Sequence, residues 1–253
     1  MLKVYLDLAR SGRVMAHLLD PPGLGVRFET REAMERGLAA AIDEHLAWLR
    51  SHGEPSLPEG GAFLVEEEVE VEGDFESGDD VGFYTPDAEP VTPEEVERYL
   101  RIASWAHEDL ALLVRPLSDD LLDWRVNERR RSIRGSLLHI AQAELWYMTR
   151  IMDDPTVEGI PEAIAHVRKR LNEKPDAVLD GLQAAWDAFQ RFARGLPPQW
   201  RERIVTPSWY ASIPERWTAR KMLRRCIEHC REHTKGIEYI LSAKDGLGST
   251  AVP

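Results

Sequence analysis

The chain of 253 residues contains only two cysteines and no long apolar run. Cys226 and Cys230 lie one helical turn apart, where a disulfide framework would connect nothing, so we interpret both as reduced thiols. No segment approaches the roughly 18 consecutive apolar residues of a membrane span, and the amino terminus lacks a charged segment followed by an apolar one. These absences argue against a disulfide-stapled fold and a membrane span, and they predict a cytoplasmic protein.

Basic residues are missing from one long segment. Between Arg50 and Arg98 there is no Lys or Arg, while 16 Asp and Glu occur there. The net charge of −12 is therefore local, because removing these 16 from the 44 acids leaves 28 against 32 basic residues. No basic stripe interleaved with aromatic residues is present, so nucleic acid is not an expected partner.

Residues 1–72 predict an α+β domain with three to four strands and one helix. Apolar and polar residues alternate in the segments expected to be strands, which are 2–8, 13–19, 25–29 and 62–72. Thr30 is a plausible N-cap for a helix that runs to about Arg50. The last segment carries five glutamates, which is typical of an edge strand kept soluble by charge. Residues 73–91 are turn-rich and acidic, and we expect them to be a linker.

From residue 92 to 242 the pattern changes to long helices, which predicts an all-α four-helix up-down bundle. Thr92, Pro93 and Glu95 form a capping box at the first helix. Helices are expected over 92–116, 133–152, 160–171, 175–195 and 218–241. We interpret 199–217 as irregular and 243–253 as a disordered tail.

Three histidines are the leading candidates for a functional site. His229 and His233 are four residues apart, so a helix presents both imidazoles on one face, about 6 Å apart. His139 lies on a second expected helix, which Ser132 would cap. Neutral imidazoles suit zinc, nickel, copper or ferrous iron, and three protein ligands leave a position for water or substrate. The alternative is three interior histidines hydrogen-bonded to their neighbours.

Other residues near these helices have two interpretations each. Four aromatic residues could line a substrate pocket, although core packing is the simpler role: Trp146, Tyr147, Trp209 and Trp217. We interpret Glu144 as part of a packed surface or buried salt bridge rather than as a metal ligand, because it projects about 140° from His139. His107 has the pattern of a solvated residue. On the last helix, Arg224 and Glu228 point away from the apolar arc.

The sequence from Ile133 to Tyr147, which contains His139, together with His229-x-x-x-His233 followed by Gly236-Ile237, resembles the DinB-like superfamily of four-helix metalloproteins. The resemblance covers roughly residues 92–241. It implies a divalent metal (zinc, nickel or iron) bound by the three histidines. It also implies kinship with thiol-dependent enzymes, including mycothiol-dependent maleylpyruvate isomerase and bacillithiol S-transferases, and therefore a low-molecular-weight thiol as cosubstrate.

The front of the chain, from Ala16 through Pro21-Pro22-Gly23 to Ala33, resembles the HicB-like antitoxin domain over about residues 1–52. Such domains usually continue into a DNA-binding segment. Here an acidic connector and helices follow instead, so neither DNA repression nor toxin capture is implied for this chain.

Together these observations predict a metal-dependent enzyme that acts on a small molecule, either a thiol S-transferase or a hydrolase. The only evident general base is a metal-bound water, so we name no catalytic residue. The alternative is a non-catalytic protein in which the helices are structural and the front domain binds a protein partner. Both a monomer and a homodimer are compatible with the sequence.

Overall fold

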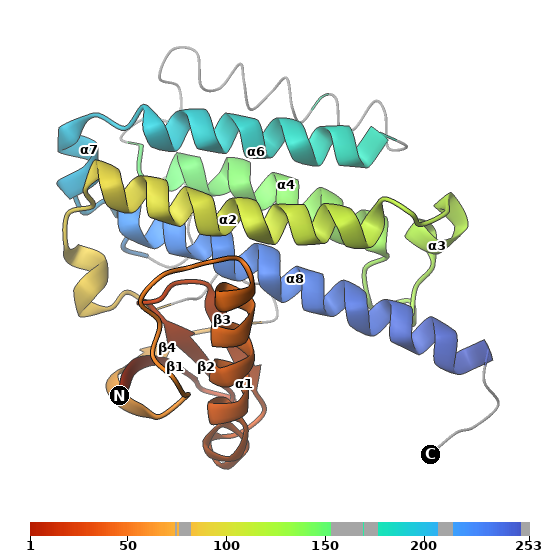
Figure 1. The fold of residues 1–253 in the computed structure, drawn as a ribbon, viewed down its shortest axis with the longest axis horizontal. Coiled ribbons are helices and arrows are strands. Elements are labelled where there is room, and N and C mark those ends of the chain that lie inside the picture. Colours follow the sequence, from red (N-terminus) through yellow and green to blue (C-terminus); the bar gives the residue numbers. More distant parts are fainter. Residues whose placement is uncertain (74, 76–81, 153–168, 170–176, 207–214, 249–253) are drawn as a thin grey trace.

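The computed structural model describes residues 1–73, 75, 82–152, 169, 177–206 and 215–248. Its N-terminal part is a small mixed sheet with one helix, and its C-terminal part is mostly helical (Figure 1). Both features agree with the fold class expected from the sequence. None of the described helices is both long and apolar enough to cross a bilayer.

The sheet has four strands in the order β3-β2-β1-β4. Their bounds are β1 Leu2–Ala9, β2 Val14–Leu18, β3 Leu24–Phe28 and β4 Phe63–Val71. β2 pairs antiparallel with β1 and β3, whereas β4 pairs parallel with β1 at the edge, as its glutamates predicted. Exposed ion pairs such as Lys3–Glu66 hold these glutamates at the surface.

Both faces of the sheet are covered. Helix α1, Arg31–Ser51, begins at its predicted N-cap Thr30 and packs Met34, Leu38, Ile42 and Leu46 against one face. Alternate strand residues point to the other face, because successive side chains of a strand leave on opposite sides. That second face, with Tyr5, Asp7 and His17, lies against residues 82–89 and the last helix.

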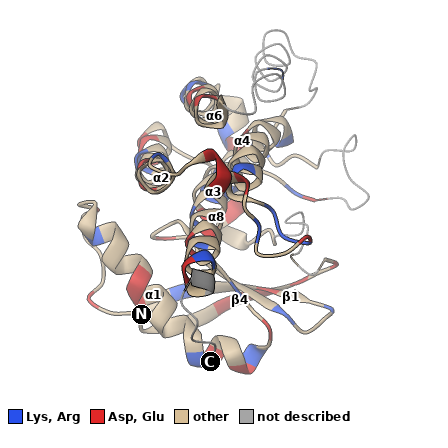
Figure 2. Ribbon diagram, turned by 90° about the vertical axis from the view of Figure 1, so that its right-hand side faces the viewer, with Lys and Arg blue, Asp and Glu red and all other residues tan. Residues whose placement is uncertain are grey.

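The helices of the C-terminal part have the following bounds: η1 Thr85–Ala88, α2 Pro93–Val114, α3 Asp119–Asp123, α4 Ile133–Arg150, α6 Val178–Arg194, α7 Pro198–Glu202 and α8 Ala219–Gly248. The capping box at Thr92 and the Ser132 cap form as predicted. α2 and α4 each pack against both α6 and α8. Seen end-on in Figure 2, α2 and α4 lie on opposite sides of this group.

Three expectations about the chain between and after the helices need correction. Residues 243–248, expected in a disordered tail, continue helix α8. The expected linker 73–91 contains η1, and its Tyr84 and Asp87 are completely buried. The expected irregular stretch 199–217 begins within α7. The helix expected over 160–171 and most of its flanks lie outside the described residues.

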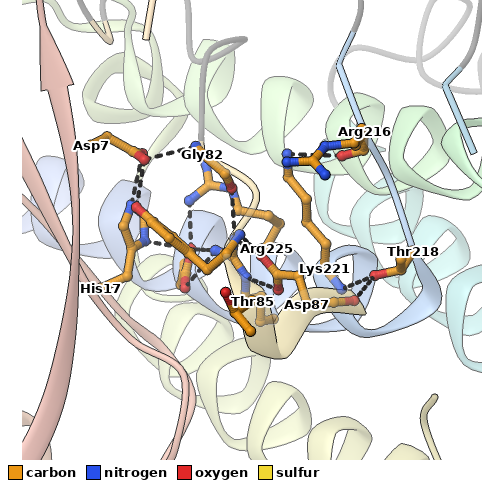
Figure 3. Close-up of polar contacts among 12 residues, drawn as sticks. Asp7, His17, Gly82, Thr85, Asp87, Arg216, Thr218, Lys221 and Arg225 are labelled. Carbon is orange, nitrogen blue, oxygen red and sulfur yellow. Dashed lines mark hydrogen bonds and ion pairs between the residues drawn. The ribbon is translucent and has the colours of Figure 1, made fainter. Parts of the chain in front are cut away.

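A buried ionic network joins the sheet to α8 (Figure 3). His17 contacts Asp7 through Nε2 at 3.0 Å and Glu228 through Nδ1 at 3.2 Å. Arg224 donates from Nε and Nη2 to the two carboxylate oxygens of Asp87, each at 2.7 Å. Arg225 donates to Glu228 at 2.7 Å. A buried carboxylate or guanidinium is tolerated only when paired in this way.

The sequence pattern places Arg224 and Glu228 outside the apolar arc of the last helix, and the network shows that this polar face is nevertheless buried. Arg224 and Glu228 do point away from the histidine face, but both have an exposed fraction of 0%. The physical reason is that residues distant in the chain supply their partners. The network therefore fixes the sheet against the helix that carries His229 and His233.

Candidate metal centre

The structure brings together the three histidines singled out from the sequence. His139 lies on α4, two turns after the Ser132 cap, and His229 and His233 lie one turn apart on α8. The Nε2 atom of His229 is 3.2 Å from Nε2 of His139 and 3.1 Å from Nε2 of His233. Three ring nitrogens therefore converge between two helices.

The spacing of these nitrogens fits a shared divalent cation. An ion about 2.0–2.1 Å from each of two nitrogens that are 3.1–3.2 Å apart would subtend an angle of about 100° between them. That angle lies between the ligand–metal–ligand angles of octahedral and tetrahedral coordination. The donor set of three imidazoles suits zinc, nickel or ferrous iron.

Burial keeps the three imidazoles uncharged. It lowers the pKa of His233 to about 3 and that of His139 to about 4, and it holds the pKa of His229 well below its usual value. The neighbouring imidazoles and the positive charges of Arg27, Arg131 and Arg225 act in the same direction. At neutral pH the rings therefore carry lone pairs that a cation can accept.

Access to the site is one-sided. His229 is buried, whereas His139 and His233 are half-buried. On the buried side, the ring of Tyr147 stands edge-on to that of His229 at 5.8 Å. Burial raises the pKa of Tyr147, so its hydroxyl stays protonated near neutral pH. It can donate a hydrogen bond but is not a base.

Three of the four candidate pocket aromatics form one cluster beside His229. Trp217 lies 5.5 Å from Trp146 and 5.7 Å from Tyr147, between ring centroids. Tyr147 and Trp217 are buried, and Trp146 is half-buried with Arg150 over its ring. They form the wall behind the histidines. Trp209 lies outside the described residues.

Among the described residues, the other ring nitrogens of the three histidines have no orienting partner. Within the part of the chain that the structure describes, no group accepts a hydrogen bond from Nδ1 of His139, His229 or His233. In many metal enzymes a carboxylate or carbonyl fills this role and fixes the ring. Here packing against neighbouring rings orients the imidazoles instead.

Sequence reasoning missed two arginines that flank this site. Arg27 comes from β3 and pairs with Glu232 on α8. Arg225 lies one turn before His229 on the same helix. The Nε atom of Arg27 and an Nη atom of Arg225 are buried and have no hydrogen-bond partner among the residues that the structure describes. No sequence signal marked Arg27, because strand β3 lies some 200 residues from α8 along the chain.

Glu144 and His107 lie together in the interior of the helical part. Glu144 is buried in a close ion-pair contact with His107, Nε2 to Oε1 at 2.7 Å, which agrees with the buried salt bridge considered for it. His107 is not solvated as expected, since its exposed fraction is only 7%. The ring of Trp186 on α6 covers it.

The fold and this site define a mostly helical protein with a three-histidine candidate metal centre, preceded by a small mixed sheet. A family model described as the DinB superfamily matches residues 102–237, more than half of the chain, and the chain belongs to this superfamily. Its members typically bind a divalent metal. No curated protein and no solved structure matches the chain. The HicB-like resemblance lies outside the matched range and stays a prediction.

Proposed function

We propose that this chain is a metal-dependent enzyme acting on a small molecule, with a divalent cation bound by His139, His229 and His233. The observation that carries the proposal is the convergence of three Nε2 atoms at 3.1 and 3.2 Å. A bound divalent cation supplies a lowered pKa for a coordinated thiol or water, and hence an anionic nucleophile near neutral pH. The four helices α2, α4, α6 and α8 would form the up-down bundle of the superfamily.

The arginines beside the histidines favour an anionic group on the substrate or cosubstrate. Arg27 and Arg225 approach His229 closely enough to depress its pKa. Each keeps a buried N–H that has no partner among the described residues and that could donate a hydrogen bond to a carboxylate. A low-molecular-weight thiol that carries a carboxylate meets this requirement.

Thiol S-transfer is the reaction that these features support first, and hydrolysis is the second. In the transferase version, the sulfur of the thiol bonds to an electrophilic carbon, and a leaving group departs with the bonding electron pair. Arg27 and Arg225 would hold the anionic cosubstrate, while Trp146, Tyr147 and Trp217 would exclude water from the buried side. In the hydrolytic version, water replaces the thiol.

Elemental analysis of the purified chain tests the metal assignment. We expect His229→Ala to lose the cation of this site, because His229 contacts both other histidines. His52→Ala is the matched control, since His52 pairs with Asp109 on α2 away from the site. A metal content unchanged by His229→Ala would overturn the assignment. Activity is then sought with a set of thiol cosubstrates, with and without a chelator.

One observation favours a non-catalytic alternative. The Nδ1 atoms of the three histidines have no acceptors among the described residues, and a site that only retains its ligands does not need them. In that case the chain would act through a protein partner of its N-terminal sheet. Capture of a small basic protein by the chain, together with no turnover of any thiol by the metal-loaded protein, would support this alternative.

A further inference from the structure

A second group of ligand-type side chains lies deeper in the helical part. His107 on α2, Glu144 on α4 and Cys226 on α8 each offer one ligand atom, and these three atoms lie within 4.8 Å of one another. Their exposed fractions are 7%, 1% and 2%. An imidazole, a carboxylate and a thiol from three helices therefore meet away from solvent.

The helix arrangement places this group near the middle of the helical part. α2 and α4, which carry His107 and Glu144, lie on opposite sides of the group formed with α6 and α8 (Figure 2). Trp186 on α6 completes the enclosure, because its ring stacks on that of His107 with 4.4 Å between centroids. All four long helices thus contribute a side chain here.

This group is separate from the three-histidine centre. Cys226 precedes His229 by three residues, about 4.5 Å along α8, and Glu144 follows His139 by five, about 7.5 Å along α4. Because α8 and α4 run in opposite directions (Figure 1), Cys226 and Glu144 are displaced from the histidines toward the same end of the helical part. The two groups share no ligand, and they are farther apart than the 3.5–4 Å or so of paired catalytic ions.

The contact between His107 and Glu144 does not have the geometry of a hydrogen bond. Nε2 and Oε1 are 2.7 Å apart, yet Nε2 and both carboxylate oxygens are buried without a well-aligned hydrogen-bond partner in the described part of the chain. In a hydrogen bond the N–H points at the oxygen. Here the nitrogen and the oxygen approach closely without that alignment, so the contact leaves the hydrogen-bonding capacity of both groups unused.

Burial of the three groups disfavours the charged forms of the carboxyl and the thiol. Burial raises the pKa of the Glu144 carboxyl and of the Cys226 thiol. A divalent cation would compensate the buried carboxylate and thiolate and would give all three groups a common partner.

We propose that His107, Glu144 and Cys226 bind a second divalent cation, with zinc as the expected ion. Nitrogen, oxygen and sulfur ligands are those that zinc accepts together, and three of them leave one tetrahedral position for a small ligand such as water. The ligands are enclosed and come from three helices, so a bound ion would connect α2, α4 and α8. The alternative explanation is a neutral pair of imidazole and carboxylic acid with a thiol beside it.

Titration of the metal-free 253-residue chain with cobalt(II) separates these explanations. Cobalt(II) occupies zinc sites, and a cobalt–thiolate bond adds a charge-transfer absorption in the near ultraviolet that three imidazoles do not give. We expect two cobalt equivalents per chain and this absorption. Cys226→Ser should bind one equivalent and lose the absorption. Cys230→Ser is the matched control and should keep both, since Cys230 is buried one turn away but is not in the group.

The remaining outcomes decide the proposal independently of the histidine centre. His229→Ala should keep the thiolate absorption with one equivalent. Glu144→Gln, which preserves shape, should bind one equivalent even if Cys226→Ser fails to fold. A wild-type chain that binds a single equivalent, without thiolate absorption and lost in His229→Ala, would overturn the second site and leave the first intact. A single equivalent kept in His229→Ala and lost in Glu144→Gln would support the second site and contradict the proposed function.

Discussion

The charge of the His17 ring is determined by its two carboxylate partners. Its two ring nitrogens face Asp7 and Glu228, and the pKa values of both carboxyls are held below their usual range, by His17 among other groups. Ionised carboxylates only accept hydrogen bonds, so both ring nitrogens must donate, and the ring is an imidazolium. These interactions outweigh burial and raise the pKa of His17.

Replacing His17 should therefore destabilise the chain strongly. We expect His17→Gln to lower the free energy of unfolding by about 3–5 kcal/mol, because it leaves a buried carboxylate without its counter-charge. Urea denaturation at neutral pH measures the loss. His52→Gln is the control, since His52 is only half-buried, and should cost about 1 kcal/mol or less. A His17→Gln chain as stable as that control would show that the imidazolium is absent.

The wild-type and His17→Gln chains should also differ in how their free energy of unfolding depends on pH. Because the folded-state pKa of His17 lies above the ordinary 6.5, its stabilising contribution is complete below that pH and is lost as the pH rises through the folded value. The wild-type free energy of unfolding should thus fall relative to that of His17→Gln on the alkaline side. A urea series across that range checks this. Parallel curves for the two chains would contradict it.

At the scale of elements, the turn before β3 is where the sheet meets α8 most closely. Gly23 has a φ of 109°, and a Cβ atom built there would lie 2.7 Å from Cγ2 of Ile227 on α8. Gly12, in the β1–β2 turn, has a φ of 90° but no atom within 4 Å of its Cβ position. Both glycines have a positive φ that would strain an alanine. Only at Gly23 would the added Cβ atom also collide with α8.

This pair separates packing from backbone strain. We expect Gly23→Ala to lower the free energy of unfolding by about 1–3 kcal/mol more than Gly12→Ala, because only the former pushes β3 away from α8. Chemical denaturation of the two variants measures the difference. Equal losses would mean that the turn and the helix adjust without cost.

The sequence predicts those elements whose signals are local. Thr30, Thr92 and Ser132 start α1, α2 and α4 as expected, because an N-cap acts on backbone N–H groups only a few residues ahead. The facing of His229 and His233 follows equally from helical spacing.

Features that depend on distant partners could not be predicted. A helical pattern marks one apolar face and places Arg224 and Glu228 outside it, but it does not show that Asp87 and His17 pair with them in the interior. His107 was misread for the same reason, since its contact Glu144 lies on another helix. The charged residues of the last turns likewise gave no indication that α8 continues to Gly248.

At the scale of the whole molecule, the sheet and the helices share one buried set of charges. Three cations, His17, Arg224 and Arg225, are paired with three anions, Asp7, Asp87 and Glu228, among the described residues. Separating the two parts would expose or strand these charges. We infer that neither part keeps its structure once the other unfolds.

The chain should accordingly unfold in one cooperative transition despite its two kinds of architecture. Calorimetry is expected to give a van't Hoff enthalpy equal to the calorimetric enthalpy. Asp87→Ala, which removes the two 2.7 Å hydrogen bonds between Arg224 and Asp87, should lower the midpoint of that single transition rather than split it. Two resolved transitions in the wild-type chain would contradict this inference.

The adjacency of Glu228 and His229 has a consequence for how the imidazoles are aimed. Neighbouring residues of a helix leave its axis about 100° apart, so an anchor on one sets the angular position of the next. The strands hold Glu228 through His17, and α8 is thereby prevented from rolling about its own axis. The small N-terminal sheet therefore helps to fix the direction in which the imidazoles of His229 and His233 point.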